Sequence, residues 1–341
     1  MTKNRSNQQR LDRPRTVVIT GASAGIGRAI AREFAKEGCK IGLIARNEEG
    51  LQACQKEVEA LGGEGLVLPL DVADFSAVDQ AATKVEEAFG PIDVWVNNAM
   101  NSVLGLFKDV DMDEFKRVTE VTYLGTVYGA KAALKRMQPR DRGSIVFVGS
   151  ALAYRGIPLQ TAYCGAKHAI EGFYDSLRAE LEHENSSIMT TMVQLPGVNT
   201  TQFSLVRNKL DKKPRPMGKI YQPEVAARAV LKASTTNARE LYVGMPTLQT
   251  ILGSKVFPGF MDWFLGKQAV EGQKTEQPAT HDKDYLFEPV PGDHGSHGQF
   301  DDKASDSGVI IRGDTFRALA SAAVFGGIIA ATSAITRALT K

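Results

Sequence analysis

The chain has 341 residues, of which 43% are hydrophobic and 23% charged, a composition typical of a globular protein with a substantial buried core. Its net charge of +2 excludes the strong positive field expected of a nucleic-acid-binding protein. Cys39, Cys54 and Cys164 lie too far apart for a metal site, and the polar N-terminus has no apolar signal run, so we expect no metal and a cytoplasmic location.

Short apolar runs alternate with longer helical patterns from Thr16 to about Gly266. The runs are rich in β-branched residues without polar alternation, as in strands that are buried on both faces. This alternation predicts an α/β fold of the doubly wound Rossmann type, with a mainly parallel seven-stranded sheet and helices on both faces. The predicted strands are 16–20, 40–45, 65–72, 93–99, 144–150, 189–196 and 240–244.

The composition changes after Gly266, where Asp, Gly, Pro, His and Ser become frequent. We therefore divide the chain into a flexible N-terminus, a Rossmann-type catalytic domain, a polar irregular extension and a terminal apolar helix. Their bounds are 1–14, 15–266, 267–315 and 316–338.

The last of these segments is a candidate membrane anchor. Nineteen uncharged residues lie between Arg317 and Arg337, which is just long enough for a helix to cross a bilayer. Many of them are small or hydroxylated, which weakens insertion and resembles a helix-packing face. A docking helix therefore stands beside the anchor as an alternative.

A glycine-rich turn joins the first predicted strand to the first helix. It reads Thr20-Gly-Ala-Ser-Ala-Gly-Ile-Gly27. Glycines at these places permit a tight turn, close approach to a pyrophosphate and close helix–sheet packing, while the helix N-terminus attracts the anion. We assign to a dinucleotide cofactor the turn residues Gly21, Ser23, Gly25, Ile26 and Gly27.

The end of the second predicted strand bears on the choice of cofactor. NAD-binding sheets usually carry an acidic residue there, which binds the ribose 2′-hydroxyl. This chain has Arg46 instead, whose guanidinium suits a 2′-phosphate. The position favours NADP(H) over NAD(H).

Three polar residues form the candidate catalytic group. Tyr163 and Lys167 lie four apart at the start of a helix predicted for 163–181, so they share one face. The Lys167 ammonium is expected to lower the pKa of the Tyr163 phenol, which would make it an effective acid–base group. Ser150 ends the fifth strand, at the sheet edge where ligands bind, and is expected to orient a substrate oxygen.

These motifs together resemble the short-chain dehydrogenase/reductase family over roughly 15–244. The resemblance implies hydride transfer between nicotinamide and a carbonyl or alcohol, with Tyr163 as acid or base. It also implies that Asp71 contacts adenine, that Asn97 steadies the central strand, and that Lys167 binds the nicotinamide ribose. The remaining cofactor residues that it implies are Asn98, Ala99, Tyr163, Pro196, Gly197 and either Thr200 or Thr201, of which we assign Thr200.

Two positions depart from the family pattern. Met100 replaces a glycine after Asn97-Asn98-Ala99, and Thr122 stands where the fourth catalytic residue is usually asparagine. We assign Thr122 to the catalytic set, although a hydroxyl lacks the paired donor and acceptor of an amide. Met100 either narrows the cofactor pocket or points outward. These departures motivate an alternative function as a catalytically weak, dinucleotide-binding scaffold or sensor.

The substrate side is predicted to be apolar, with an aromatic cluster at 253–266 that could cover the pocket, form a subunit contact or meet a membrane. We therefore expect a lipophilic carbonyl or alcohol, and membrane association if the C-terminus inserts. Family members commonly form homo-oligomers. Another chemistry on the same fold, such as epimerisation or dehydration, is a weaker alternative. The expected pocket residues are Leu104, Leu106, Leu152, Tyr154, Ile157 and Phe203.

Overall fold

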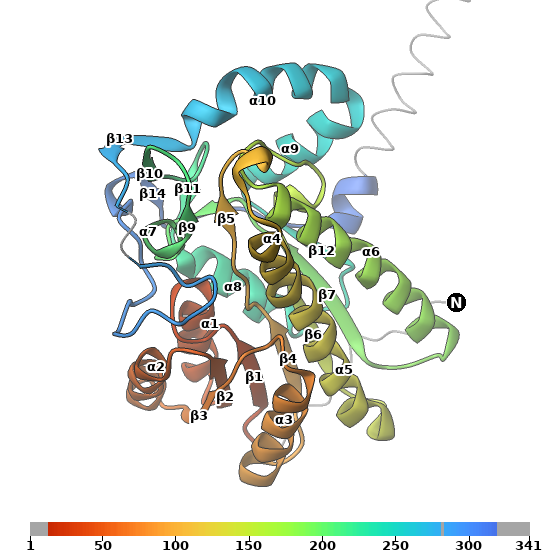
Figure 1. Cartoon of the computed structure of the whole chain (residues 1–341). Coiled ribbons are helices and arrows are strands. Elements are labelled where there is room, and N and C mark those ends of the chain that lie inside the picture. Colours follow the sequence, from red (N-terminus) through yellow and green to blue (C-terminus); the bar gives the residue numbers. More distant parts are fainter. Residues whose placement is uncertain (1–12, 281–282, 319–341) are drawn as a thin grey trace, which may run out of the picture.

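The structure is a computed structural model that describes residues 13–280 and 283–318. A central sheet divides it into three layers, with helices on both faces (Figure 1). This confirms the doubly wound α/β fold. The predicted apolar helix, 316–338, lies outside the described residues beyond 318, as does most of the flexible N-terminus.

The central sheet has eight strands, seven of them parallel. The strand order reverses beside β1, which opens the crevice where such sheets bind ligands. From one edge to the other the strands are β15 (Ile310–Arg312), β12 (Glu240–Val243), β7 (Met189–Gln194), β6 (Ser144–Val148), β4 (Val94–Asn97), β1 (Thr16–Thr20), β2 (Lys40–Ala45) and β3 (Glu64–Pro69).

The eighth strand, β15, was not among the seven predicted from the sequence. It pairs antiparallel with β12, so that Val243 lies opposite Ile310. The run is only three residues long and follows a polar segment. Periodicity could not reveal it, because its partner lies far away in the chain.

Two apolar cores lie on the two faces of the sheet. On one face the strands pack against α1 (Gly25–Ala35), α2 (Glu48–Ala60) and α8 (Pro223–Ala233). The other face is covered by α3 (Phe75–Phe89), α5 (Gly125–Met137) and α6 (Thr161–His183). A short helix, α4 (Met112–Val118), and a π-helical turn, η2 (Thr119–Leu124), lead into α5.

The segments that follow β7 and β12 build a superstructure over the carboxyl edge of the sheet (Figure 1). It contains a helix pair, α9 (Gly244–Val256) and α10 (Pro258–Gly272), and a short helix, α7 (Gln202–Leu205). Small sheets tie it together, built from β5 (Val103–Leu104), β8 (Gly197–Val198), β9 (Arg207–Asn208), β10 (Lys212–Pro214), β11 (Ile220–Tyr221), β13 (Lys274–Pro278) and β14 (Ala304–Ser305).

The extension after 266 therefore has more regular structure than the irregular segment we expected. α10 continues to Gly272, and the strands β13, β14 and β15 each pair with a distant part of the domain. No helix within 13–280 or 283–318 combines the length and apolar character that a membrane crossing requires.

Candidate active site

The glycine-rich turn has the geometry that its residue types predict. Gly21 and Gly25 have φ of 69° and 55°, in the left-handed region that favours glycine. A Cβ on Gly27 would lie 2.0 Å from the Gly21 carbonyl oxygen, so the helix can approach the turn only without a side chain. The Asn98 amide donates to the Thr20 carbonyl at 2.9 Å and steadies the turn from β4.

A cavity of about 210 Å³ opens beside this turn. Its wall combines the N-terminal end of α1 with residues that follow β2, β3 and β4, namely Gly21, Ser23, Gly25, Ile26, Gly27, Arg46, Asp71, Asn98 and Ala99. A helix N-terminus and a backbone without side chains are what a pyrophosphate requires, and the Gly25 N–H at this end of α1 donates to the Gly295 carbonyl at 3.0 Å. The residues of this first cavity fit the adenosine and pyrophosphate part of a dinucleotide.

The charged residues of the first cavity already have partners. The Arg46 guanidinium donates to the backbone carbonyls of Tyr285 and Phe287. The Asp71 carboxylate pairs with Arg117 and accepts the Ala73 N–H at 3.0 Å. Both side chains line the cavity, but Arg46 is held by the C-terminal extension, a contact that no sequence motif predicted.

Ser150, Tyr163 and Lys167 lie together on the wall of a second cavity, of about 410 Å³. The Ser150 hydroxyl lies beside the Tyr163 phenol, close enough to affect its pKa. The Lys167 ammonium lies 5.6 Å from the centre of the Tyr163 ring and donates to the Val148 carbonyl at 2.7 Å. A strand end and the first turn of α6 thus bring the three predicted side chains to one place.

The electrostatics of Tyr163 differ from the expectation. Burial raises the pKa of its phenol, and the Ser150 hydroxyl is what opposes that rise. Burial also lowers the pKa of Lys167 to about 8, because the ammonium lies in an apolar surrounding. The Lys167 charge is not among the causes of the Tyr163 pKa shift, and its ammonium is bonded to the Val148 carbonyl.

The two cavities adjoin, because Ile26, Asn98, Met100, Thr200 and Gln202 line both of them. Met100 thus faces the cavities rather than pointing outward. Thr200 also lies closest to the glycine turn: a Cβ on Gly25 would be 3.3 Å from the Thr200 Cβ. Pro196 and Gly197 line the second cavity. A dinucleotide that occupied both cavities would pass between these side chains.

Thr122 is bonded to the loop after β4. Its buried hydroxyl accepts the Asn101 N–H at 3.1 Å and donates to the Asn101 carbonyl at 3.0 Å. It is not among the residues that line either cavity. Its hydroxyl thus holds the loop after β4, and its place in the catalytic set stays a prediction.

The second cavity is largely apolar on the side away from Ser150. Of the six expected pocket residues, Leu152, Ile157 and Phe203 line it, whereas Leu104 is fully buried, Leu106 is exposed and Tyr154 bonds to carboxylates. Sequence reasoning missed Met217 and Pro246, which carried no motif. The aromatic cluster at 253–266 did signal part of the wall, since Met261, Phe264 and Leu265 of α10 line the cavity.

The C-terminal extension supplies functional candidates that the sequence analysis missed entirely. Tyr285, Pro289, Val290 and His294 line the first cavity, although all other residues that line it lie at Leu205 or earlier in the chain. No motif or spacing marked them, because their place depends on how the extension folds back.

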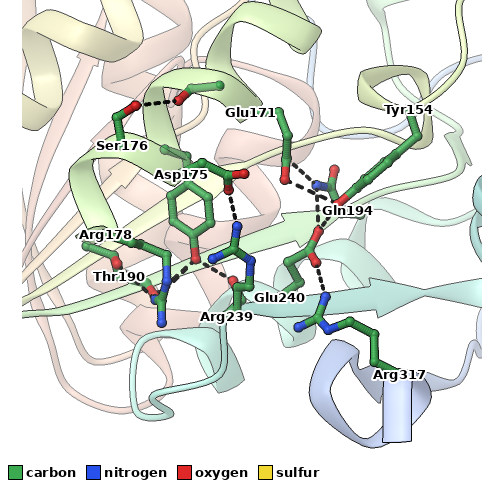
Figure 2. A network of polar contacts seen from close by, with 12 residues as sticks. Tyr154, Glu171, Asp175, Ser176, Arg178, Thr190, Gln194, Arg239, Glu240 and Arg317 are labelled. Atoms are coloured by element: carbon green, nitrogen blue, oxygen red, sulfur yellow. Dashed lines mark hydrogen bonds and ion pairs between the residues drawn. The ribbon is translucent and has the colours of Figure 1, made fainter. Parts of the chain in front are cut away.

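A network of polar side chains joins α6 to β7 and β12 (Figure 2). Glu171, one turn after Lys167, accepts hydrogen bonds from Gln194 at 2.9 Å and Tyr154 at 3.2 Å. Glu240 of β12 shares both of those partners and pairs with Arg317 at 2.7 Å. Burial and the nearby Glu240 charge raise the pKa of Glu171 to about 7.

Comparison with known proteins identifies the relatives of this chain. The family model for short chain dehydrogenases matches residues 15–211. An uncharacterised oxidoreductase of Bacillus subtilis is 32% identical, over 92% of this chain and 88% of its own. A 3-dehydrosphinganine reductase of Danio rerio is 37% identical over 63% of this chain and 67% of its own. A dehydrogenase/reductase SDR family protein 7-like of Drosophila melanogaster is 30% identical over 78% and 84%.

Proposed function

Because the chain belongs to the short-chain dehydrogenase/reductase family of oxidoreductases, we propose that it transfers a hydride between NADP(H) and a lipophilic carbonyl or alcohol, with Tyr163, Lys167 and Ser150 as its catalytic residues. The observation that carries this proposal is that Ser150, Tyr163 and Lys167 line one cavity, which adjoins the cavity of the glycine-rich turn. A protein that only binds dinucleotide has no need of that arrangement.

The nicotinamide supplies or accepts the hydride when it is bound. In reduction the Tyr163 hydroxyl gives its proton to the substrate oxygen as negative charge develops there. Ser150 orients that oxygen and, by a hydrogen bond, stabilises the phenolate that Tyr163 becomes. In oxidation the proton transfer is reversed, and the Tyr163 phenolate takes the proton of the substrate alcohol.

Lys167 supports both roles from the same face of α6. Its buried ammonium stands 5.6 Å from the Tyr163 ring centre, so its charge favours the phenolate more strongly than it would in water. With a pKa of about 8 it is still mostly protonated at neutral pH. We also propose that Lys167 contacts the nicotinamide ribose, as its resemblance to the family implies.

The preference for NADP(H) is supported by Arg46. Arg46 directly follows β2, and it is the one lysine or arginine among the described residues that line the first cavity. The described residues at that strand end, Ala45, Arg46 and Asn47, include no carboxylate. A guanidinium pairs well with a phosphate. Its present bonds to two carbonyls leave it in the cavity wall, where a phosphate could compete for them.

A lipophilic substrate is supported by the second cavity and by α10. Apolar side chains dominate the far wall of the cavity, as in sites for apolar ligands. On the outer side of the same helix pair Phe257, Phe260 and Trp263 are exposed, a surface suited to a membrane interface. Two relatives are named for the reduction of ketones, 3-dehydrosphinganine and 3-ketodihydrosphingosine.

The test is a screen of aldehydes and ketones that follows the near-ultraviolet absorbance of NADPH, with the wild type beside Tyr163→Phe. We expect turnover by the wild type and a loss of at least about a thousandfold in the variant. Tyr128→Phe, a change of a half-buried tyrosine on α5, is the matched control. Equal turnover by Tyr163→Phe would contradict the proposal and favour a scaffold or another chemistry.

A further inference from the structure

Residues 283–295, which we call the clamp segment, lie across the mouth of the first cavity. In Figure 1 they form the blue loop above α1 and α2. Tyr285, Pro289, Val290 and His294 of this segment line the cavity together with the glycine-rich turn. A dinucleotide bound there would have protein on the outer side as well as on the sheet side.

The clamp segment is fixed at both of its ends. Near its start the Leu286 side chain is fully buried among apolar residues beside β5 and α4. Its carbonyl accepts from the Asn101 amide at 3.3 Å and from Arg117 at 3.2 Å. The Tyr285 N–H donates to the Leu205 carbonyl at 3.0 Å. This end of the clamp segment is anchored in the superstructure.

The other end is anchored to the cofactor-binding half. The Asn47 amide donates to the carbonyls of Val290 at 3.0 Å and Gly292 at 2.8 Å. Arg28 of α1, almost fully buried, is shared between Glu57 of α2 and Asp293. The Arg28 side chain is 4% exposed, whereas its partners Glu57 and Asp293 are 38% and 49% exposed, so the pair fastens the clamp segment at the edge of the domain.

Tyr285 has a hydroxyl that lacks a partner within the described ranges. The oxygen is shielded from solvent although the residue as a whole is partly exposed, and the residue lines the first cavity. Burial and the charge that Tyr163 would carry as a phenolate both raise the pKa of Tyr285, so the group is a neutral donor. A buried hydroxyl without a partner is unfavourable, so this one needs an acceptor such as a ligand oxygen or a water.

We propose that the clamp segment closes over the bound dinucleotide and that the Tyr285 hydroxyl donates a hydrogen bond to one of its oxygens. This inference rests on the proposed dinucleotide function and adds to it a wall and a donor from the C-terminal extension. Ribose hydroxyls and phosphate oxygens are both acceptors of the right chemistry.

The first test compares Tyr285→Phe with the wild type in NADPH binding, read from the fluorescence of the reduced nicotinamide. Loss of one hydrogen bond should weaken binding about 3- to 30-fold. Most of the loss should appear as faster dissociation in stopped-flow displacement. Tyr128→Phe is the control and should bind as the wild type does.

Thermal unfolding of the cofactor-free proteins separates ligand binding from structure. Because Tyr285→Phe removes a hydroxyl without a partner, it should leave the melting temperature unchanged or higher, while reducing the stabilisation that NADPH gives. A lower melting temperature of the cofactor-free variant, or unchanged NADPH affinity, would overturn the proposal.

The second test loosens the clamp segment with Asp293→Ala, which removes one of the two carboxylates on Arg28. If the segment retains the cofactor, dissociation of NADPH should become faster and binding weaker. If the segment instead blocks the cavity, binding should become tighter, which would contradict the proposal. Failure of the wild type to bind either nicotinamide cofactor would defeat the proposed function itself, whereas tight wild-type binding with unaffected variants would defeat this inference alone.

Discussion

Ser150 and Tyr163 line the wall of one cavity, although one follows β6 and the other lies in the first turn of α6. Ser150 lowers the pKa of the Tyr163 phenol against the effect of burial. Ser150 also accepts the Leu152 N–H at 3.1 Å, which fixes the orientation of its hydroxyl. The structure thus places a serine beside the candidate acid–base group, Tyr163, in addition to the lysine that the sequence predicted.

Arg46 provides a test of cofactor preference. Arg46→Asp should weaken NADPH binding about 10- to 100-fold more than NADH binding, because it replaces a charge-assisted bond to the 2′-phosphate by repulsion. Equilibrium titration of both cofactors measures this difference.

A control is needed because Arg46 also holds the clamp segment. Asn47→Ala removes two other bonds to that segment and leaves the cation in place. It should weaken the binding of both cofactors to a similar degree. Equal effects of Arg46→Asp on NADPH and NADH would show that the arginine does not recognise the phosphate.

Lys167 predicts an alkaline limit to catalysis. Its pKa of about 8 means that the ammonium is lost as the pH rises through that value, and with it the charge that favours the phenolate. The kcat/KM for carbonyl reduction should therefore fall above about pH 8. In Lys167→Arg the cation persists to much higher pH, so the kcat/KM of this variant should not fall above about pH 8. If the variant shows the same fall as the wild type, the fall is caused by the titration of another group.

Glu171 predicts how stability depends on pH. Its pKa is raised to about 7 in the folded protein, against 4.5 in an unfolded chain, so folding favours the protonated carboxyl. The stability that this proton provides is complete below about pH 4.5 and is lost as the pH rises through 7. Glu171→Gln mimics the protonated group and should flatten the fall, raising the free energy of unfolding at pH 8 by about 1–3 kcal/mol.

Denaturant unfolding from pH 5 to pH 8 measures the effect of Glu171→Gln. Glu180→Gln, at an exposed position on the same helix, is the matched control and should leave the pH dependence of the wild type. If Glu171→Gln follows that dependence too, the carboxyl is already ionised in the folded protein.

The exposed aromatic surface of α10 predicts contact with lipid. Full-length protein should float with phospholipid vesicles in a density gradient, and Trp263→Ser should reduce that fraction because it removes an exposed ring from the proposed interface. A carbonate wash of membranes separates this contact from insertion by the C-terminus. Protein that stays free of vesicles and washes off completely would remove the support for a membrane-associated enzyme.

Much of the fold and of the central site could be predicted from local patterns. The seven parallel strands are short buried runs, and the glycine turn carries its constraint in three residue types. Ser150, Tyr163 and Lys167 could be placed together because a strand end and one helix turn fix them. In each case the residues that decide the structure are neighbours in the chain.

The rest depends on contacts between distant segments. β15 forms only because β12 offers it an edge, and Tyr285 reaches the first cavity only because Leu286 is buried beside β5. The bonds that Thr122 and Lys167 make could not be predicted for the same reason, since their partners, Asn101 and the Val148 carbonyl, lie in other segments. No periodicity in the sequence records such partners.

The most direct test of the central claim follows the hydride itself. NADPH that carries deuterium at both hydrogen positions of nicotinamide C4 is incubated with an accepted ketone, and the product alcohol is analysed by mass spectrometry. We predict one deuterium on the carbinol carbon with the wild type and almost no labelled alcohol with Tyr163→Phe. Equal labelling by the two proteins, or alcohol formed by the wild type without label, would contradict the account.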